Sequence, residues 1–240
     1  MPECTLKQRI HDGDPLNIAW ASLAMDEAEL EARLTAEPAD MVFVDIQHAP
    51  YSEAGMVTFC NRANALGVPP LLRIRHTRFA HLAGNYADLG PRGILVPMVE
   101  TVATVDEAIE NFYYPPIGKR SWGPWNAYGY DRIEDRVAYG AWWNSHGVLA
   151  LQIETIEGVL AARALAKPGV DLFLFGSNDL SFSLEAHPES LFNSVEDCIQ
   201  HVAERTAGTG VRVAAGMLPY GKFAAAEPAP LVDPPEGGSV

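Results

Sequence analysis

The sequence predicts an α/β protein, specifically a (β/α)8 barrel in which parallel strands alternate with helices. Seven short apolar runs recur along the 240 residues, and helix-like segments fill most of the gaps between them. Such alternation is typical of a parallel sheet with right-handed crossovers. Polar side chains suited to chemistry also follow several of the runs. Functional groups spread over four strand ends favour a closed barrel over an open sheet.

The expected strands are rich in Val, Ile, Leu and Phe, which is the composition of strands buried on both faces. They occupy residues 16–23, 42–46, 69–74, 93–96, 148–153, 170–175 and 211–215. The helical segments between them are expected at residues 26–34, 52–66, 78–89, 105–112 and 195–206. The sequence contains no glycine-rich dinucleotide fingerprint and no P-loop, so a nucleotide-binding sheet is not expected.

Two regions interrupt this alternation. Residues 112–147 form an insertion that holds Trp122, Trp125, Trp142 and Trp143. We interpret it either as a packing patch or oligomer interface, or as a loop over the active-site mouth in which Arg120 helps to bind substrate.

The second interruption is the C-terminus. Residues 218–240 are rich in Pro, Ala and Gly, so we expect an irregular or disordered tail and an eighth strand that is missing or irregular. The barrel domain is accordingly assigned to residues 1–217, and the tail is counted separately.

Composition excludes several classes of partner. The net charge of −14 argues against nucleic acid, which binds basic surfaces. No apolar run approaches the roughly 20 residues that a membrane-spanning helix needs, and the N-terminus lacks the pattern of a signal peptide. Cys4, Cys60 and Cys198 have neither disulfide-type nor metal-type spacing, so we expect a reduced, cytoplasmic setting.

Glu154 and Asp179 each follow an apolar run, which places them at neighbouring strand ends of the predicted barrel. Two adjacent carboxylates are costly to desolvate without a positive partner, so we interpret them as ligands of a divalent cation. The alternative is a buried hydrogen-bonded acid at Glu154 and a helix N-cap at Asp179. Gly176 and Ser177 favour the metal interpretation, because they let backbone N–H groups approach an anion.

Asp45 and His48 follow another run, and Arg73 closes the next one. In the functional interpretation, Asp45 fixes the tautomer of His48, which then acts as an acid or base. The alternative is a purely structural histidine. Arg73 is expected to point into the barrel, because an interior guanidinium needs an anion and a metal-bound substrate would supply one.

The lysines argue against one class of mechanism. None of Lys7, Lys119, Lys167 and Lys222 lies in an expected strand, whereas a Schiff-base enzyme needs a desolvated lysine on the inner wall of the barrel. We therefore expect a metal, not an iminium ion, to stabilise any enolate that forms in this protein.

Six ordered segments of the chain resemble the HpcH/HpaI aldolase and citrate lyase family, most closely its metal-dependent pyruvate aldolases. The similar segments are residues 44–50, 71–73, 95–99, 114–120, 152–155 and 176–181. The resemblance spans residues 15–217 and implies a (β/α)8 barrel of the phosphoenolpyruvate/pyruvate type. Two departures stand out: Gln47 occupies a position where the family usually has Glu, and the family's eighth strand has no counterpart after Met217.

The resemblance also implies roles for particular residues. Glu154 and Asp179 would bind Mg²⁺, Mn²⁺ or Co²⁺, and Arg73 would contact the pyruvyl oxygen. His48, supported by Asp45, would act as acid and base through water. Gln152 and the backbone of Gly176 and Ser177 would complete the substrate pocket. Family members often assemble into homo-oligomers, so a hexamer or another trimer-based assembly is expected.

The resemblance predicts a lyase that cleaves or forms 4-hydroxy-2-oxo acids, giving pyruvate and an aldehyde through a metal-bound enolate. Decarboxylation of oxaloacetate would pass through the same enolate. Two alternatives remain open. One is a synthase that forms carbon–carbon bonds in secondary metabolism, and the other is a non-catalytic homologue that acts as a binding or interface protein.

Overall fold

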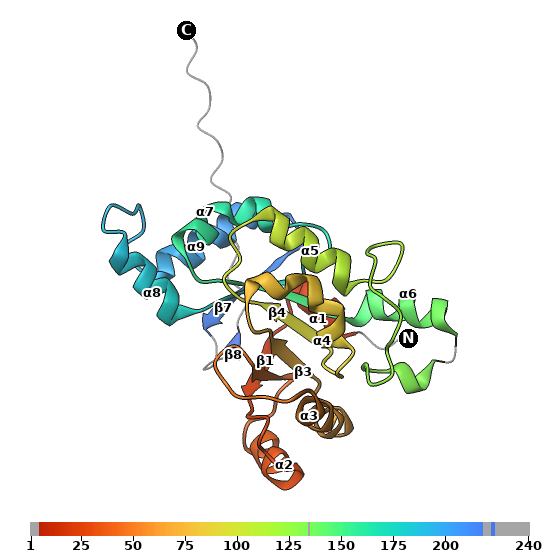
Figure 1. Cartoon of the computed structure of the whole chain (residues 1–240). Helices are drawn as coiled ribbons and strands as arrows, with labels where there is room; N and C mark the ends of the chain where they lie inside the picture. The colour runs from red at the N-terminus through yellow and green to blue at the C-terminus, as the bar shows by residue number, and fades with distance from the viewer. Residues whose placement is uncertain (1–4, 134, 218–221, 224–240) are drawn as a thin grey trace.

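The computed structural model describes residues 5–133, 135–217 and 222–223, and it shows a curled sheet wrapped by helices (Figure 1). All seven expected strands are present, with ends shifted by a few residues. They are β1 (Leu16–Trp20), β2 (Met41–Asp45), β3 (Pro70–Arg73), β4 (Gly93–Val96), β5 (Val148–Ile153), β6 (Leu172–Phe175) and β7 (Arg212–Met217).

The seven strands are parallel and neighbours in the order of the chain, from β1 through β7. Their registers align successive strand ends; for example, Asp45 on β2 pairs with Arg73 on β3. The irregular barrel predicted from the sequence is therefore confirmed. Because all seven carboxyl ends lie at one end of the barrel, side chains that follow different strands converge there.

One short strand, β8 (Lys222–Phe223), comes from the segment in which a regular strand was not expected. It pairs with β1 in the antiparallel direction, with Leu16 opposite Phe223. The eighth position is thus occupied irregularly by two residues, not by a parallel strand. The remaining expectations for residues 218–240 concern positions outside the described part of the chain.

Helices surround the curled sheet, most of them on its outer side (Figure 1). They are α1 (Leu6–Asp12), α2 (Glu27–Ala36), α3 (Glu53–Ala65), η1 (Thr77–Leu82), α4 (Ala83–Ala87), α5 (Val102–Phe112), η2 (Tyr130–Arg132), α6 (Arg136–His146), α7 (Ile156–Leu165), α8 (Ser177–Ala186) and α9 (Val195–Thr206). Many begin at a side-chain cap; the Ser52 hydroxyl, for instance, accepts from the amide of Gly55 at the start of α3.

The inside of the barrel is filled by alternate residues of the strands, with Phe43, Leu71 and Ala150 among them. Leu6 and Ile10 of α1 join the same cluster, so this helix closes the amino-terminal end of the barrel. A second and larger cluster lies between the sheet and the outer helices. The interior is therefore a packed core and not a pore.

Residues 112–147 contribute heavily to the outer layer. Trp143 and Tyr139 on α6 are fully buried, and the Trp143 indole N–H donates to the carbonyl of Phe112 at 3.0 Å. These contacts match the packing interpretation of the segment. Trp125 differs, because 68% of its surface is exposed.

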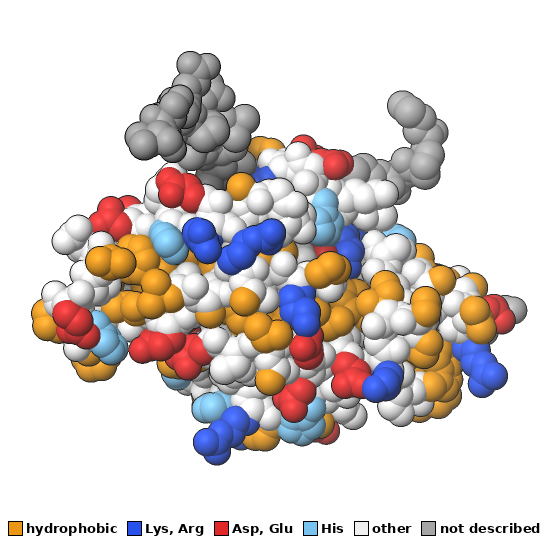
Figure 2. Space-filling model, turned by 90° about the horizontal axis from the view of Figure 1, so that it is seen from above, with side chains coloured by type: hydrophobic (Ala, Val, Ile, Leu, Met, Phe, Trp, Pro, Cys, Tyr) orange, Lys and Arg blue, Asp and Glu red, His pale blue; other side chains and the backbone are white. Residues whose placement is uncertain are grey.

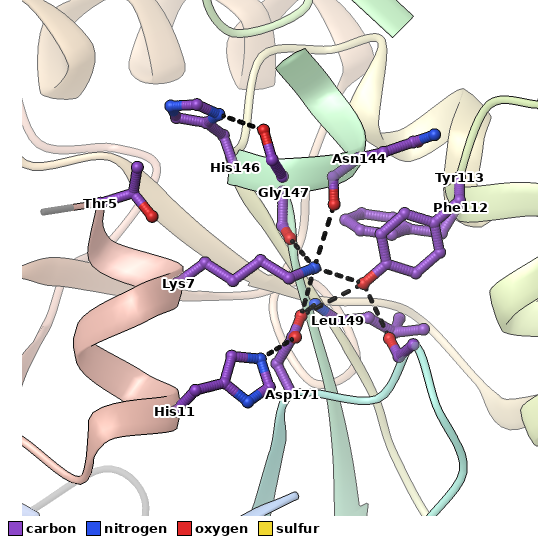
Figure 3. A network of polar contacts seen from close by, with 12 residues as sticks. Thr5, Lys7, His11, Phe112, Tyr113, Asn144, His146, Gly147, Leu149 and Asp171 are labelled. Carbon is purple, nitrogen blue, oxygen red and sulfur yellow. Dashed lines mark hydrogen bonds and ion pairs between the residues drawn. The ribbon is translucent and has the colours of Figure 1, made fainter. Parts of the chain in front are cut away.

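A polar network fastens α1 to the barrel (Figure 3). Asp171, at the start of β6, is almost fully buried and accepts from His11 at 2.8 Å and from the amide of Leu149 at 2.9 Å. The ammonium of Lys7 lies 3.2 Å from the same carboxylate and donates to the hydroxyl of Tyr113. The buried charge of Asp171 is thus balanced by two basic side chains of α1.

On the face shown in Figure 2, Lys and Arg side chains stand singly or in small groups among acidic and apolar ones. A continuous basic surface of the kind that binds nucleic acid is not seen on that face. Among the described residues, no helix is both long and apolar enough to cross a membrane.

Candidate active site

The candidate site lies at the carboxyl ends of β2, β3 and β5. Asp45 and Arg73 are the last residues of β2 and β3, Gln152 lies near the end of β5, and Glu154 follows it directly. The first three lie two positions after the inner-core residues Phe43, Leu71 and Ala150, so they continue the interior face of their strands. Glu154 lies two positions after Gln152 and continues the same alternation. The structure therefore brings together four of the residues predicted from the sequence.

Arg73 is held by Asp45 in a two-pronged ion pair. Nε of Arg73 donates to Oδ1 of Asp45 at 3.0 Å, and Nη2 donates to Oδ2 at 2.7 Å. Both side chains are mostly buried. Burial by itself would raise the pKa of Asp45, but the hydrogen bonds and charge of Arg73 outweigh it and leave that pKa below its usual value. Asp45 is thus an ionised carboxylate whose two oxygens both hold Arg73 in position.

The third nitrogen of the Arg73 guanidinium, Nη1, faces β5. Nη1 lies 3.4 Å from the amide oxygen of Gln152 and 4.0 Å from Oε1 of Glu154. Neither is a short contact, so this N–H group can turn to a substrate oxygen placed between Arg73 and Glu154.

Glu154 is almost completely buried, and its two oxygens have different surroundings. Oε2 accepts from the backbone N–H of Met98 at 2.9 Å. Oε1 is buried and has no hydrogen-bond partner among the described residues. Its position requires glycine at residue 176, because a Cβ there would lie 2.0 Å from this oxygen. The carboxylate is thus seated against the backbone at the start of α8 with one oxygen unsatisfied.

The pKa of Glu154 is raised to about 7, chiefly by burial and in smaller part by the nearby carboxylate of Asp179, while the Met98 amide and Arg73 act in the opposite direction. Asp179 is exposed in the first turn of α8. Two neighbouring acids, one of them carrying an unsatisfied buried oxygen, are an unfavourable arrangement unless a cation lies between them.

These residues fit a divalent cation. Carboxylate oxygens are the ligands that Mg²⁺ and Mn²⁺ prefer, and Oε1 of Glu154 is an orphaned acceptor beside a second carboxylate. In the described part of the chain, no group of three or more His, Cys, Asp and Glu side chains is arranged to hold a metal. A cation here would therefore have two protein ligands and keep several positions for water and substrate.

His48 is exposed at the mouth of the site, three residues after the end of β2. Its positive charge, when present, acts on Asp45, but no hydrogen bond joins the two side chains. Asp45 instead accepts from the amide of Gln47 and from Arg73. The oxygen of Gln47, at the position where Glu was expected from the family resemblance, is buried without a partner among the described residues.

The contacts of Arg120 are with residues outside the candidate site. Its guanidinium is buried in the outer layer, pairs with Asp88, and lies 4.8 Å from the ring of Tyr114 and 4.4 Å from that of Trp143. Tyr114 and Trp143 belong to residues 112–147, so these contacts of Arg120 match the packing interpretation of that segment.

Met98 is a residue of the site that side-chain reasoning did not single out. Its φ is +48°, in the left-handed region that residues other than glycine rarely adopt. In this conformation its N–H donates to Glu154. The only sequence signal is the preceding Pro97, which fixes the chain just before the turn but does not reveal where the next amide points.

The fold and these side chains together define a barrel enzyme with an anchored arginine and an acid pair at its strand ends. The chain belongs to the HpcH/HpaI aldolase/citrate lyase family, whose model matches residues 20–220. It is accordingly a carbon–carbon lyase.

Among curated proteins, the hydroxypyruvate/pyruvate aldolase of Roseobacter denitrificans is 28% identical over 220 residues, covering 90% of this chain and 83% of the relative. Among solved structures, an HpcH/HpaI aldolase from Desulfitobacterium hafniense superposes with a TM-score of 0.75 at 25% identity, covering 88% of this chain and 81% of the other. The citrate synthase SbnG superposes with a TM-score of 0.73 at 25% identity over the same shares. Macrophomate synthase, at 21% identity and a TM-score of 0.69, shares the fold.

Proposed function

We propose that this protein is a metal-dependent aldolase that cleaves or forms a 4-hydroxy-2-oxo acid, with pyruvate as one product and an aldehyde as the other. The observation that carries the proposal is the unsatisfied Oε1 of Glu154, 4.0 Å from Nη1 of Arg73. A 2-oxo acid has adjacent carboxylate and keto oxygens, which suit a cation on one side and a guanidinium on the other. The naming of relatives as hydroxypyruvate/pyruvate aldolases supports the same substrate class.

Arg73 would stabilise the negative charge that develops on the keto oxygen. Because Nε and Nη2 are fixed by Asp45, Nη1 is presented without a large loss of side-chain freedom. When the C3–C4 bond breaks, its electron pair moves toward C3 and the keto oxygen, and pyruvate enolate results. The enolate then takes up a proton at C3 to give pyruvate.

His48 would remove the proton from the 4-hydroxyl group, so that the aldehyde can leave. Its exposure at the mouth suits a group that acts through water and exchanges protons with solvent. Gln152 and the first amides of α8, at Ser177, would orient the substrate carboxylate.

The divalent cation, Mg²⁺ or else Mn²⁺ or Co²⁺, would be held by Glu154 and Asp179. When bound, it would supply Lewis-acid polarisation of the 2-oxo acid. It would also relieve the repulsion between the two carboxylates, which adds to the effect of burial in raising the pKa of Glu154.

A second function from the same class of chemistry is a synthase that adds the enolate to a different acceptor. The structural similarity to the citrate synthase SbnG favours keeping this candidate. The two candidates share the enolate and differ only in the electrophile, so they are separated by product analysis with a panel of aldehydes and oxo acids.

We further propose that the chain assembles with copies of itself, as a trimer or hexamer. Large apolar side chains exposed on the single chain support this: Trp125 in the aromatic segment and Phe182 on α8 are 68% and 73% exposed. A monomeric mass in solution at micromolar concentration would refute it.

The direct test of the proposed function is release of pyruvate from oxaloacetate and from 4-hydroxy-2-oxo acids, with and without EDTA. Activity should disappear with the chelator and return with Mg²⁺ or Mn²⁺. Glu154→Gln keeps the shape of the side chain but weakens the metal ligand, so it should be inactive, whereas Glu204→Gln on the exposed side of α9 should match the wild type. Full turnover in EDTA or in Glu154→Gln would exclude this proposal, and absence of all activity with metal would favour a non-catalytic homologue.

A further inference from the structure

A pocket of about 480 Å³ opens at the amino-terminal end of the barrel. Its wall includes residues that directly precede three strands: Asp40 before β2, Pro69 before β3 and Arg92 before β4. Because the strands are parallel, this pocket lies at the opposite end of the barrel from Asp45, Arg73 and Glu154. It is therefore separate from the candidate active site.

Arg92 is the unusual residue of this pocket. Only 9% of its surface is exposed, yet no carboxylate of the described residues lies within ion-pair distance of it. Its Nε donates to the carbonyl of His146 at 3.1 Å, and its guanidinium lies beside Tyr128, 5.4 Å from the ring centroid and with the Tyr128 hydroxyl as a further hydrogen-bond partner. By contrast, the buried Arg73 and Arg120 are each paired with an aspartate.

The acidic side chains nearby have other partners. Asp40, in the pocket wall, is engaged by Arg9 at 2.6 Å and by the amide of Asn17 at 2.8 Å. Asp171, behind the wall, is paired with Lys7 and His11. Neither carboxylate is left to neutralise Arg92.

The basic side chains around Arg92 act on one another. Burial lowers the pKa of His146, and the charges of Arg92 and Lys7 lower it further, against a hydrogen bond to the carbonyl of Trp142. The pKa of Lys7 is lowered, chiefly by burial, and the positive charge of Arg92 contributes to the lowering. Figure 3 shows Thr5 and His146 on the same side of Lys7, with the Lys7 ammonium reaching inward to Asp171. Of the arginines in the pocket wall, Arg9 is thus paired with Asp40, whereas Arg92 has no acidic partner among the described residues.

We infer that this pocket binds a phosphate group, either inorganic phosphate or the phosphate of a small ester, on the guanidinium of Arg92. A buried guanidinium without a counter-ion among the described residues is costly, and a phosphate oxyanion would provide a matching charge for its forked N–H groups. The pocket is larger than one phosphate, so room remains for the organic part of an ester. Occupancy would tie α1 to the starts of β2 to β4.

The test is calorimetric titration of the full chain, in EDTA, with inorganic phosphate and with glycerol 3-phosphate at constant ionic strength. We expect saturable binding of at least one of them to the wild type. Arg92→Gln should weaken it by about 10-fold or more, the loss expected for a charge-assisted hydrogen bond. Tighter binding of the ester would identify a phosphorylated metabolite as the ligand type, and equal or weaker binding would identify phosphate itself.

Two further variants keep the result decisive. Ala39→Glu adds a carboxylate to the partly exposed wall of the pocket without removing Arg92, so it should also weaken binding even if Arg92→Gln does not fold. Arg73→Gln removes a buried arginine at the opposite end of the barrel, whose Nη1 makes only long contacts. This variant should leave phosphate affinity unchanged. Absence of saturable binding to the wild type, unchanged binding in Ala39→Glu, or loss only in Arg73→Gln would overturn the inference. None of these outcomes depends on turnover, so they are independent of the proposed aldolase activity.

Discussion

At the scale of single residues, the site is defined by what each charged group is already bonded to. Asp45 is occupied by Arg73, which explains why it forms no hydrogen bond with His48. In Glu154, Oε2 accepts a hydrogen bond from Met98, whereas Oε1 has no hydrogen-bond partner among the described residues. The roles of Arg73 and His48 in the proposed reaction are therefore separable by mutation.

Arg73→Ala should impair both aldol cleavage and oxaloacetate decarboxylation, because both reactions pass through the enolate. His48→Ala should impair aldol cleavage by about 10²–10⁴-fold and decarboxylation much less, because decarboxylation needs no deprotonation of a 4-hydroxyl group. Steady-state kinetics on both substrates measure the difference. Arg33→Ala on α2 serves as the control and should retain both activities. If His48→Ala damaged the two reactions equally, the role given to His48 would be wrong.

Met98 offers a second prediction at this scale. A left-handed conformation disfavours residues that carry a Cβ, by roughly 1–2 kcal/mol. Met98→Gly should accordingly be more stable than Met98→Ala by about 1 kcal/mol, although glycine normally lowers stability relative to alanine. Urea denaturation of the two variants measures this difference in the free energy of unfolding. Greater stability of the alanine variant would show that residue 98 does not hold the left-handed conformation.

Both Met98 variants retain the backbone N–H that Glu154 accepts, so they should keep the metal-dependent activity apart from any contribution of the exposed methionine side chain. The residue thus illustrates a limit of sequence reasoning. Carboxylates at strand ends can be predicted because the residue type itself supplies the functional group. The contribution of Met98 depends instead on the direction of its backbone N–H, which the residue type does not reveal.

At the scale of elements, the strands could be predicted because each is a continuous apolar run bounded by polar residues. Helix α1 was not among the expected helices, and for α8 the sequence suggested only a helix N-cap at Asp179 as an alternative. In α1 only Leu6 and Ile10 are buried, and in α8 only Leu180 is, so neither helix has a strong apolar stripe. What fixes α1 is its contact with Asp171, a residue about 160 positions away, and no local pattern encodes such a contact.

The attachment of α1 predicts a specific pH dependence of stability. The hydrogen bond with Asp171 raises the pKa of His11, against the smaller effect of burial. Protonated His11 is therefore favoured in the folded state. Its stabilising contribution is complete below the unfolded-state pKa, about 6.5, and is lost as the pH rises through the raised folded-state value.

His11→Gln should consequently lower the melting temperature more at about pH 5.5 than at about pH 8.5. Thermal unfolding followed by circular dichroism at the two pH values measures the difference. The exposed His81 provides a control, since His81→Gln should have a small effect at both. A larger loss at the higher pH would contradict the assignment of the His11–Asp171 ion pair.

At the scale of the whole molecule, the barrel separates two polar regions by a packed interior. The candidate active site lies at the carboxyl ends of the strands, and the pocket around Arg92 lies with the α1 network at the amino ends. The first could largely be predicted, because parallel strands bring successive strand ends together. The second could not, because Arg92, Lys7 and His146 come from separate parts of the chain and follow no shared motif.

The placement of Arg120 shows the same limit in another way. A basic residue within an aromatic segment fits both a substrate pocket and a packing cluster. Its surroundings in the folded protein are Asp88 and the rings of Tyr114 and Trp143. Which of the two environments applies is decided by tertiary packing, and the sequence alone left both interpretations open.

The proposed reaction depends on formation of pyruvate enolate between Arg73 and Glu154. The most direct measurement is exchange of the methyl protons of pyruvate with D2O, followed by proton NMR, because it requires no knowledge of the aldehyde. With Mg²⁺ present, the wild type and Arg33→Ala should exchange these protons, while Arg73→Ala and Glu154→Gln should not exceed the rate in buffer. Absence of exchange with the wild type, or exchange by Arg73→Ala at the wild-type rate, would contradict the account.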